Sequence, residues 1–260
     1  MLIPLHSIPP ASQSVRAPRV VQLLIITNII VFAYQLYLHA RGISMVLTYG
    51  AVPERITHVI PFFPLLPNIF HPSLITSLFL HDVEIYQSGF LHIVGNMLYL
   101  SAFGPGLENR IGHVKFFLFY FLCGVVATLC HTVLYYNSSV PLIGASGAIA
   151  GVMGAHFFAC PKSRIRCLLF IYIVSLPASI VLVTWILLQL FNTYFFQQGS
   201  LVAWLAHIAG FIAGVYFIRK FRPLPPPDPA KSASPVSVFY RLVPISPHRL
   251  TERKRRSDTL

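Results

Sequence analysis

Four residues have the types and spacing needed for acyl-transfer chemistry. Ser146 lies in LIGASGAIAGVMG, His207 in LAHIAGFIAG, and His92 and Asn96 in GFLHIVGNMLYL. A serine hydroxyl becomes a nucleophile when a base removes its proton, and histidine suits that role because its usual pKa of about 6.5 is close to working pH. The four-residue spacing of His92 and Asn96 places both side chains on one helical face. These residues predict a serine hydrolase if the fold brings them together.

The acidic residues and cysteines exclude several other chemistries. None of the seven Asp and Glu residues lies in the middle of an apolar segment. An aspartyl membrane protease needs two such carboxylates, and proton-coupled transport is disfavoured for the same reason. The chain has neither H-E-x-x-H nor a CxxC pair, so we expect no metal and no cofactor. Because no aspartate is available to orient His207, we expect a Ser–His dyad and not a triad.

Composition indicates an integral membrane protein. Of the 260 residues, 55% are apolar and 10% are charged, whereas soluble domains contain about 25% charged residues. The net charge of +12 would suit a nucleic-acid binder, but the charges lie between and after the apolar runs. We therefore expect a lipid bilayer and no nucleic acid as the partner.

The apolar segments predict an all-α fold, a polytopic bundle of six transmembrane helices. A spanning helix needs about 20 apolar residues. A cytosolic segment 1–19 should precede the membrane domain 20–220, which includes a long outer loop at about 41–86, and a Pro-rich basic tail 221–260 should follow it. We expect Pro177 to kink the fifth helix. The six predicted spans are 20–40, 87–104, 113–136, 143–160, 165–190 and 200–220.

Lysine and arginine placement predicts that both termini lie in the cytosol. In that orientation 17 of the 19 basic residues face inside, and only Arg41 and Arg55 face outside, as the positive-inside rule requires. The second, fourth and sixth helices then enter from the outer surface, which places Ser146, His92 and His207 in the outer part of the membrane.

Glycines recur beside two of these polar residues. Gly144, Gly147, Gly151 and Gly154 form a small-residue stripe beside Ser146, and His207 lies on a second stripe with Gly210 and Gly214; such stripes allow close helix contact. Taken singly, each feature has a structural explanation, since a serine in a glycine-rich helix usually packs and an intramembrane histidine more often bonds a neighbouring helix. Together they favour a site. His156 has no comparable partner in the sequence, and we expect it to be interfacial.

The chain resembles the rhomboid family of intramembrane serine proteases over about residues 20–220. The resemblance rests on FLH followed by GFLHIVGNMLYL, on GPGLENRIGHVKFFLFYFLCG, on GASG, and on AHIAGFIAG, in this order. The six-span layout is similar to the simple bacterial form, which implies a bacterial inner membrane.

The resemblance implies a role for each candidate. It implies that Ser146 is the nucleophile and His207 the general base, and that His92, Asn96 and Gly144 help to stabilise the oxyanion. It implies that Glu108, in the loop after the second helix, is structural. Two departures stand out: Ala150 replaces an aromatic residue that often packs against the histidine, and the Trp-Arg pair of the first outer loop is missing, where this chain reads HPSLITSLFLH.

The function implied is an intramembrane endopeptidase that hydrolyses peptide bonds in or near transmembrane segments of membrane proteins, through an acyl-enzyme. Two alternatives stay open. A catalytically inactive rhomboid-like protein that binds transmembrane clients would share the fold, and a small-solute transporter would line its path with the same polar residues. The sequence does not define an oligomeric state.

Overall fold

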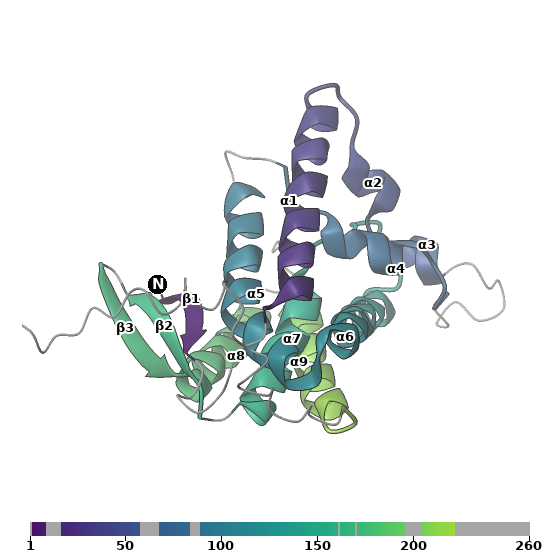
Figure 1. Ribbon diagram of the computed structural model, residues 1–260. Helices are drawn as coiled ribbons and strands as arrows, with labels where there is room; N and C mark the ends of the chain where they lie inside the picture. Colours follow the sequence, from purple (N-terminus) through teal and green to yellow (C-terminus); the bar gives the residue numbers. More distant parts are fainter. Residues whose placement is uncertain are drawn as a thin grey trace, which may run out of the picture.

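A computed structural model shows a bundle of helices with a small antiparallel sheet at its side (Figure 1). The structure describes residues 2–8, 17–57, 68–83, 89–160, 162–169, 171–195 and 204–221. The expected Pro-rich tail lies outside these described residues from 222 onward.

Within the described residues the bundle contains six apolar helices, and the prediction of a helical membrane protein is confirmed. Three of them are long and apolar enough to cross a bilayer, and the other three are shorter apolar helices. The long ones are α1 Arg19–His39, α5 Gly89–Ile111 and α6 His113–Leu134; the shorter ones are α7 Ser146–Ala159, α8 Ala178–Phe195 and α9 Trp204–Ile218. Between α1 and α5 lie α2 Met45–Tyr49, α3 Pro53–Thr57, α4 Ser73–Thr76 and the 3₁₀ turn η1 Ser77–Phe79.

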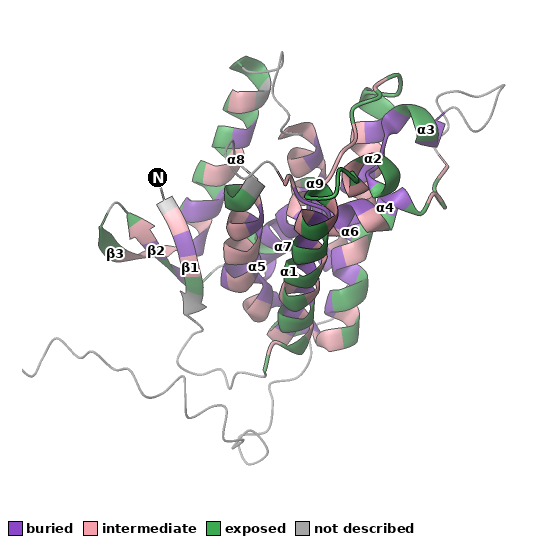
Figure 2. Cartoon of the chain, turned by 90° about the horizontal axis from the view of Figure 1, so that it is seen from above, coloured by how far each residue is buried: buried purple, intermediate pink, exposed green. Residues whose placement is uncertain are grey.

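The outer helices expose apolar side chains. On α1, Leu23 is 54% exposed and Ile30 63% exposed, and exposed surface covers much of α1 and α8 (Figure 2). A water-soluble protein rarely leaves such continuous apolar faces uncovered. These faces are suited to lipid acyl chains, so the chain is an integral membrane protein.

Helix α7 is the centre of the bundle. Every residue from Gly147 to His156 is buried, and α7 packs against α5, α6 and α9. A helix that is apolar and buried all round must be surrounded by other elements. The central position of α7 places its first residue, Ser146, within reach of three other helices.

The glycine stripes bring the backbones of α7 and α9 together. A methyl group at Gly214 would overlap the carbonyl oxygen of Gly151, and one at Gly210 would overlap that of Gly147. Likewise, a methyl group at Gly154 would overlap the carbonyl oxygen of Phe211. Only residues without a side chain permit this approach. The predicted role of both stripes in helix contact is confirmed.

The expected fifth span is wrong in its first half. Residues 165–177 do not begin a helix but contribute to the hairpin of β2 Arg164–Leu169 and β3 Tyr172–Pro177. The strand β1 Leu2–Ile8 completes a sheet of order β1-β2-β3, with Ile165 opposite Leu176 in antiparallel register. The β-branched and aromatic run in LLFIYIVSL favours strand, and an apolar run of this length does not distinguish strand from helix. Pro177 therefore ends β3 and does not kink a helix.

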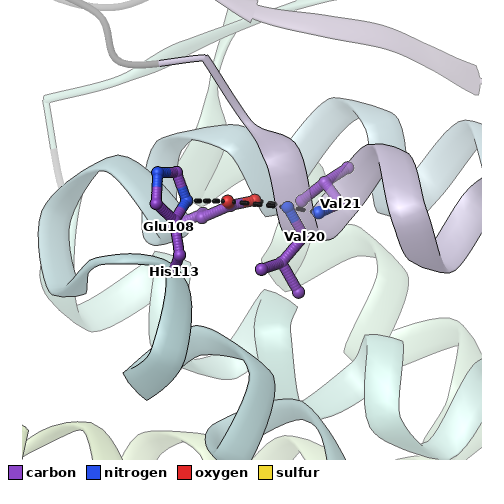
Figure 3. A network of polar contacts seen from close by, with 4 residues as sticks. All are labelled: Val20, Val21, Glu108 and His113. Atoms are coloured by element: carbon purple, nitrogen blue, oxygen red, sulfur yellow. Dashed lines mark hydrogen bonds and ion pairs between the residues drawn. The ribbon is translucent and has the colours of Figure 1, made fainter.

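Glu108 lies near the C-terminal end of α5 and joins three elements (Figure 3). Its carboxylate accepts hydrogen bonds from the backbone N–H groups of Val20 and Val21, both at 2.9 Å, and contacts Nδ1 of His113. The first N–H groups of a helix have no partner within it, so Glu108 of α5 caps α1 from outside. This contact agrees with the structural role implied for Glu108.

His156, for which the sequence indicated no partner, is fully buried and has a polar contact at each ring nitrogen. Its Nδ1 lies 3.1 Å from the carbonyl oxygen of Phe103, and its Nε2 lies 2.8 Å from the hydroxyl oxygen of Ser163. The partner Ser163 comes seven residues later, beyond the end of α7, and no helical spacing indicated it.

Candidate active site

Ser146 and His207 meet across the contact between α7 and α9. The Oγ atom of Ser146 lies 2.8 Å from Nε2 of His207, although the two residues are 61 positions apart. The glycine stripes on the two helices make this distance possible, because α9 approaches α7 without intervening side chains. Both side chains are half-buried. The arrangement allows proton transfer from the hydroxyl to the imidazole.

Ser146 is the first residue of α7, where the helix favours negative charge. The first N–H groups of a helix are unpaired within it, and its dipole is positive at this end. The preceding Gly144 has a φ of +114°, in the left-handed region that favours glycine. Its N–H donates to the carbonyl oxygen of Ser77 at 2.9 Å, which fixes the turn leading into Ser146.

His92 lies against this turn. A methyl group added at Gly144 would be 3.0 Å from Nε2 of His92 and 3.6 Å from Oγ of Ser146. The imidazole of His92 is therefore a neighbour of the serine hydroxyl, as its expected role requires. It also leaves no room for a side chain at position 144.

Asn96 is buried, and its amide contacts a residue that was not predicted to belong to the site. Its Nδ2 lies 2.9 Å from Nε2 of His81, whose ring centroid is 5.1 Å from that of His92. Burial, together with the nearby His92, lowers the pKa of His81 to about 3. The His81 ring is therefore neutral at pH 7, and its Nε2 can accept from the Asn96 amide.

Gln35 of α1 holds His81 by its backbone. The amide oxygen of Gln35 accepts from the N–H of His81 and its amide nitrogen donates to the carbonyl oxygen of His81, both at 3.0 Å. Both residues are buried. The motif FLH marked His81 in the sequence, but nothing there connected it to Asn96 or to Gln35.

Helix α8 contributes two residues beside His207. The Oε1 atom of Gln189 lies 2.8 Å from Nδ1 of His207. The ring of Trp185 lies 6.0 Å from the imidazole, between centroids, and Trp204 of α9 presents its ring edgewise at 6.1 Å. Neither Gln189 nor Trp185 was predicted. The only signal was a glutamine in an apolar segment, where polar side chains are rare.

The described residues contain no group of three or more His, Cys, Asp or Glu side chains that could hold a metal ion. The polar groups described above fit acyl transfer to a serine hydroxyl. They define a helical membrane protein with a half-buried Ser–His pair at the N-terminus of a helix.

Comparison with known proteins identifies the family. The family model of the Rhomboid domain matches residues 72–223, more than half of the chain. The chain belongs to the rhomboid family, and the resemblance read from the motifs is confirmed.

Relatives come from several kingdoms. The chain is 32% identical over 120 residues to RHOMBOID-like protein 6, mitochondrial, of Arabidopsis thaliana. The aligned region covers 44% of this chain and 36% of that protein. It is 27% identical over 190 residues to Rhomboid-like protease 3 of Toxoplasma gondii, and the aligned region covers 70% of this chain and 66% of that protein. It is 33% identical over 85 residues to Putative rhomboid protease YdcA of Bacillus subtilis, and the aligned region covers 33% of this chain and 39% of that protein. The chain thus spans between about a third and two thirds of these relatives.

Proposed function

We propose that this protein is an intramembrane serine endopeptidase, with Ser146 as nucleophile and His207 as general base. The observation that carries the proposal is the 2.8 Å separation between Oγ of Ser146 and Nε2 of His207 at the N-terminus of α7. The positive end of a helix favours a developing oxyanion, and a binding protein has no need of a Ser–His pair at that place.

The proposed reaction begins when Oγ of Ser146 attacks the carbonyl carbon of a peptide bond and its proton passes to Nε2 of His207. The carbonyl oxygen becomes an oxyanion, which the N–H groups at the start of α7 and the imidazole of His92 would stabilise. His207 then gives its proton to the leaving amine, and the C–N bond breaks to leave an acyl-enzyme. Water, deprotonated by His207, releases the second product and restores the serine.

Asn96 and Gly144 support this oxyanion site in different ways. Asn96 carries two amide hydrogens, so its bond with His81 is compatible with donation of the other to substrate. Gly144 leaves the space that His92 occupies beside Ser146. We assign both to oxyanion stabilisation together with His92.

The proposed substrates are transmembrane segments of other membrane proteins. An intact helix hides its amides in internal hydrogen bonds, so the scissile bond becomes accessible when the substrate helix unwinds locally. The proposed orientation has both termini in the cytosol and a membrane domain at 20–220, which places the Ser146 end on the outer side. The six-helix layout supports a bacterial cell membrane as its location, although mitochondrial proteins are also among its relatives.

The test is cleavage of a model transmembrane substrate by purified protein in detergent and in liposomes. We expect the wild type to cleave it, and Ser146→Ala and His207→Ala to be inactive while remaining folded. Cleavage that survives both substitutions would refute the dyad.

A fluorophosphonate probe separates the enzyme from an inactive client-binding member of the family. We expect the probe to label the wild type and not Ser146→Ala. Ser163→Ala is the matched control, since Ser163 also lies 2.8 Å from a histidine nitrogen, and its labelling should equal that of the wild type. Absence of labelling, with client binding unchanged in Ser146→Ala, would identify a binding protein.

A further inference from the structure

The imidazole of His207 is held at both nitrogens by two different helices. Nε2 faces Ser146 of α7, and Nδ1 lies 2.8 Å from Oε1 of Gln189 of α8. Gln189 is 6% exposed, so water does not readily replace its amide at Nδ1. The ring is thus fixed between α7 and α8 while its own backbone belongs to α9.

The amide oxygen selects one tautomer of His207. In a neutral imidazole one ring nitrogen carries a hydrogen and donates, and the other ring nitrogen accepts. Oε1 can only accept, so it stabilises the form with hydrogen on Nδ1. That form leaves the lone pair of Nε2 directed at the serine hydroxyl, as a general base requires. The opposite tautomer would present N–H to Ser146 and could not take its proton.

A neutral amide suits this position in a membrane protein. A carboxylate would orient the imidazole as well, but burying an isolated charge among apolar side chains is strongly unfavourable. The amide oxygen accepts the same hydrogen bond, and its dipole also favours the imidazolium that forms after proton transfer. Glutamine thus supplies orientation without a permanent buried charge.

Trp185 provides a second contact from the same face of α8. It lies four residues before Gln189, so both side chains point to one side of the helix. Its ring lies 6.0 Å from His207 and stacks on Phe211 at 6.3 Å and 27°. Ala150, on α7, has no ring with which to support the histidine, and α8 provides one.

We propose that Gln189 is a positioning residue for His207, so that a neutral amide orients the base of the Ser146–His207 dyad and Trp185 packs beside it. This inference rests on the proposed function. It also has a consequence for the fold: the base is oriented only while α8 lies against α9, because both supporting residues belong to α8.

The first test is the pH dependence of kcat/KM for two substitutions of opposite electrostatic effect. We expect Gln189→Leu to lower kcat about 10- to 100-fold, within the range of general-base effects, with KM changed less than about threefold. The acid limb of the kcat/KM profile of Gln189→Leu should move to lower pH, because the imidazolium of His207 loses a hydrogen-bond acceptor. Gln189→Glu should move the acid limb to higher pH by about one unit or more, since an adjacent anion favours the imidazolium. If Gln189 did not bond Nδ1, Gln189→Leu would leave the acid limb of the profile where it is in the wild type.

The second test does not depend on activity. In protein labelled with ¹⁵N-histidine, the ring-nitrogen shifts of His207 should report hydrogen on Nδ1 in the wild type and a mixture of tautomers in Gln189→Leu. Leu188→Ala is the matched control, because Leu188 is the preceding residue on α8 and is 53% exposed. It should leave the tautomer, kcat and both pH limbs unchanged.

The outcomes separate the two proposals. Ser146-dependent cleavage with unchanged pH limbs and tautomer in both Gln189 variants would overturn the role of Gln189 and leave the proposed function intact. Cleavage that survives Ser146→Ala would overturn the proposed function, whatever the state of Gln189. A shift of the two acid limbs in opposite directions, with the tautomer change, would establish the positioning role.

Discussion

The two ends of α7 each have a Ser–His pair, and they differ in almost everything except distance. At the N-terminal end, Ser146 lies 2.8 Å from Nε2 of His207; beyond the C-terminal end, Ser163 lies 2.8 Å from Nε2 of His156. The second pair is buried, with His156 fully enclosed. A short Ser–His distance alone therefore does not define a nucleophile.

The helix dipole distinguishes the two serines. Ser146 is at the positive end of α7, which favours an oxyanion, whereas Ser163 follows the negative end, which disfavours it. The Ser163 hydroxyl also lies 2.7 Å from the carbonyl oxygen of Cys160, so a second acceptor competes for its proton. The pair at the N-terminal end is suited to catalysis, and the other to holding the start of β2 against α7.

The strongest test of this contrast exchanges each serine for alanine. We expect Ser146→Ala to lower cleavage by about 10⁴-fold or more, with little effect on thermal unfolding. Ser163→Ala should leave cleavage within about threefold but reduce stability by about 1–3 kcal/mol, because the buried His156 loses a partner. Cleavage rates and unfolding midpoints in detergent measure both effects. A folded but inactive Ser163→Ala would contradict the assignment.

Substitution of the residues assigned to oxyanion stabilisation, His92 and Asn96, should have the next largest effect on cleavage. We expect His92→Ala to lower kcat about 10²- to 10³-fold, as loss of one oxyanion donor does elsewhere, with a smaller change in KM. Asn96→Ala should have a smaller effect because part of its amide is engaged with His81. His39→Ala, at the exposed end of α1, is the control. An unchanged kcat in His92→Ala would remove it from the site.

The contact of α7 and α9 can be loosened without touching a polar group. We expect Gly214→Ala to lower cleavage at least about tenfold and to reduce stability by about 1–3 kcal/mol, since its methyl group would overlap the Gly151 carbonyl oxygen and force the helices apart. Gly95→Ala is the matched control, because a methyl group there meets nothing within 4 Å. It should be neutral or stabilising by up to about 1 kcal/mol. Equal behaviour of the two variants would show that close packing does not set the dyad.

The contacts of Glu108, which lie outside the catalytic site, should affect the stability of the protein more than its cleavage rate. We expect Glu108→Gln to reduce stability by about 3 kcal/mol, as loss of a buried charged partner does, because its carboxylate joins α1, α5 and α6. Cleavage at low temperature should stay within about threefold of the wild type. Unfolding midpoints and initial rates, measured on the same preparation, would expose a large direct effect on catalysis.

Much of the membrane domain could be predicted from the sequence, and the errors in the prediction have physical causes. Sustained apolar runs gave α1, α6 and α9 to within a few residues. The run at 165–177 misled because apolar residues suit a buried helix and a strand equally. Its pairing with β1, more than 150 residues earlier in the chain, leaves no local signal. The partner of His156 was missed for the same reason, because Ser163 lies beyond the end of α7.

By itself the sequence determined the membrane class, the glycine stripes and the candidates Ser146 and His207, since residue type and helical spacing are local properties. The tertiary structure alone decided which groups surround the site and support His207 and Asn96. Gln189, Trp185, His81 and Gln35 reach the site from α8, the loop before α5, and α1. Their contacts depend on how helices rotate and cross, which packing of the whole bundle determines.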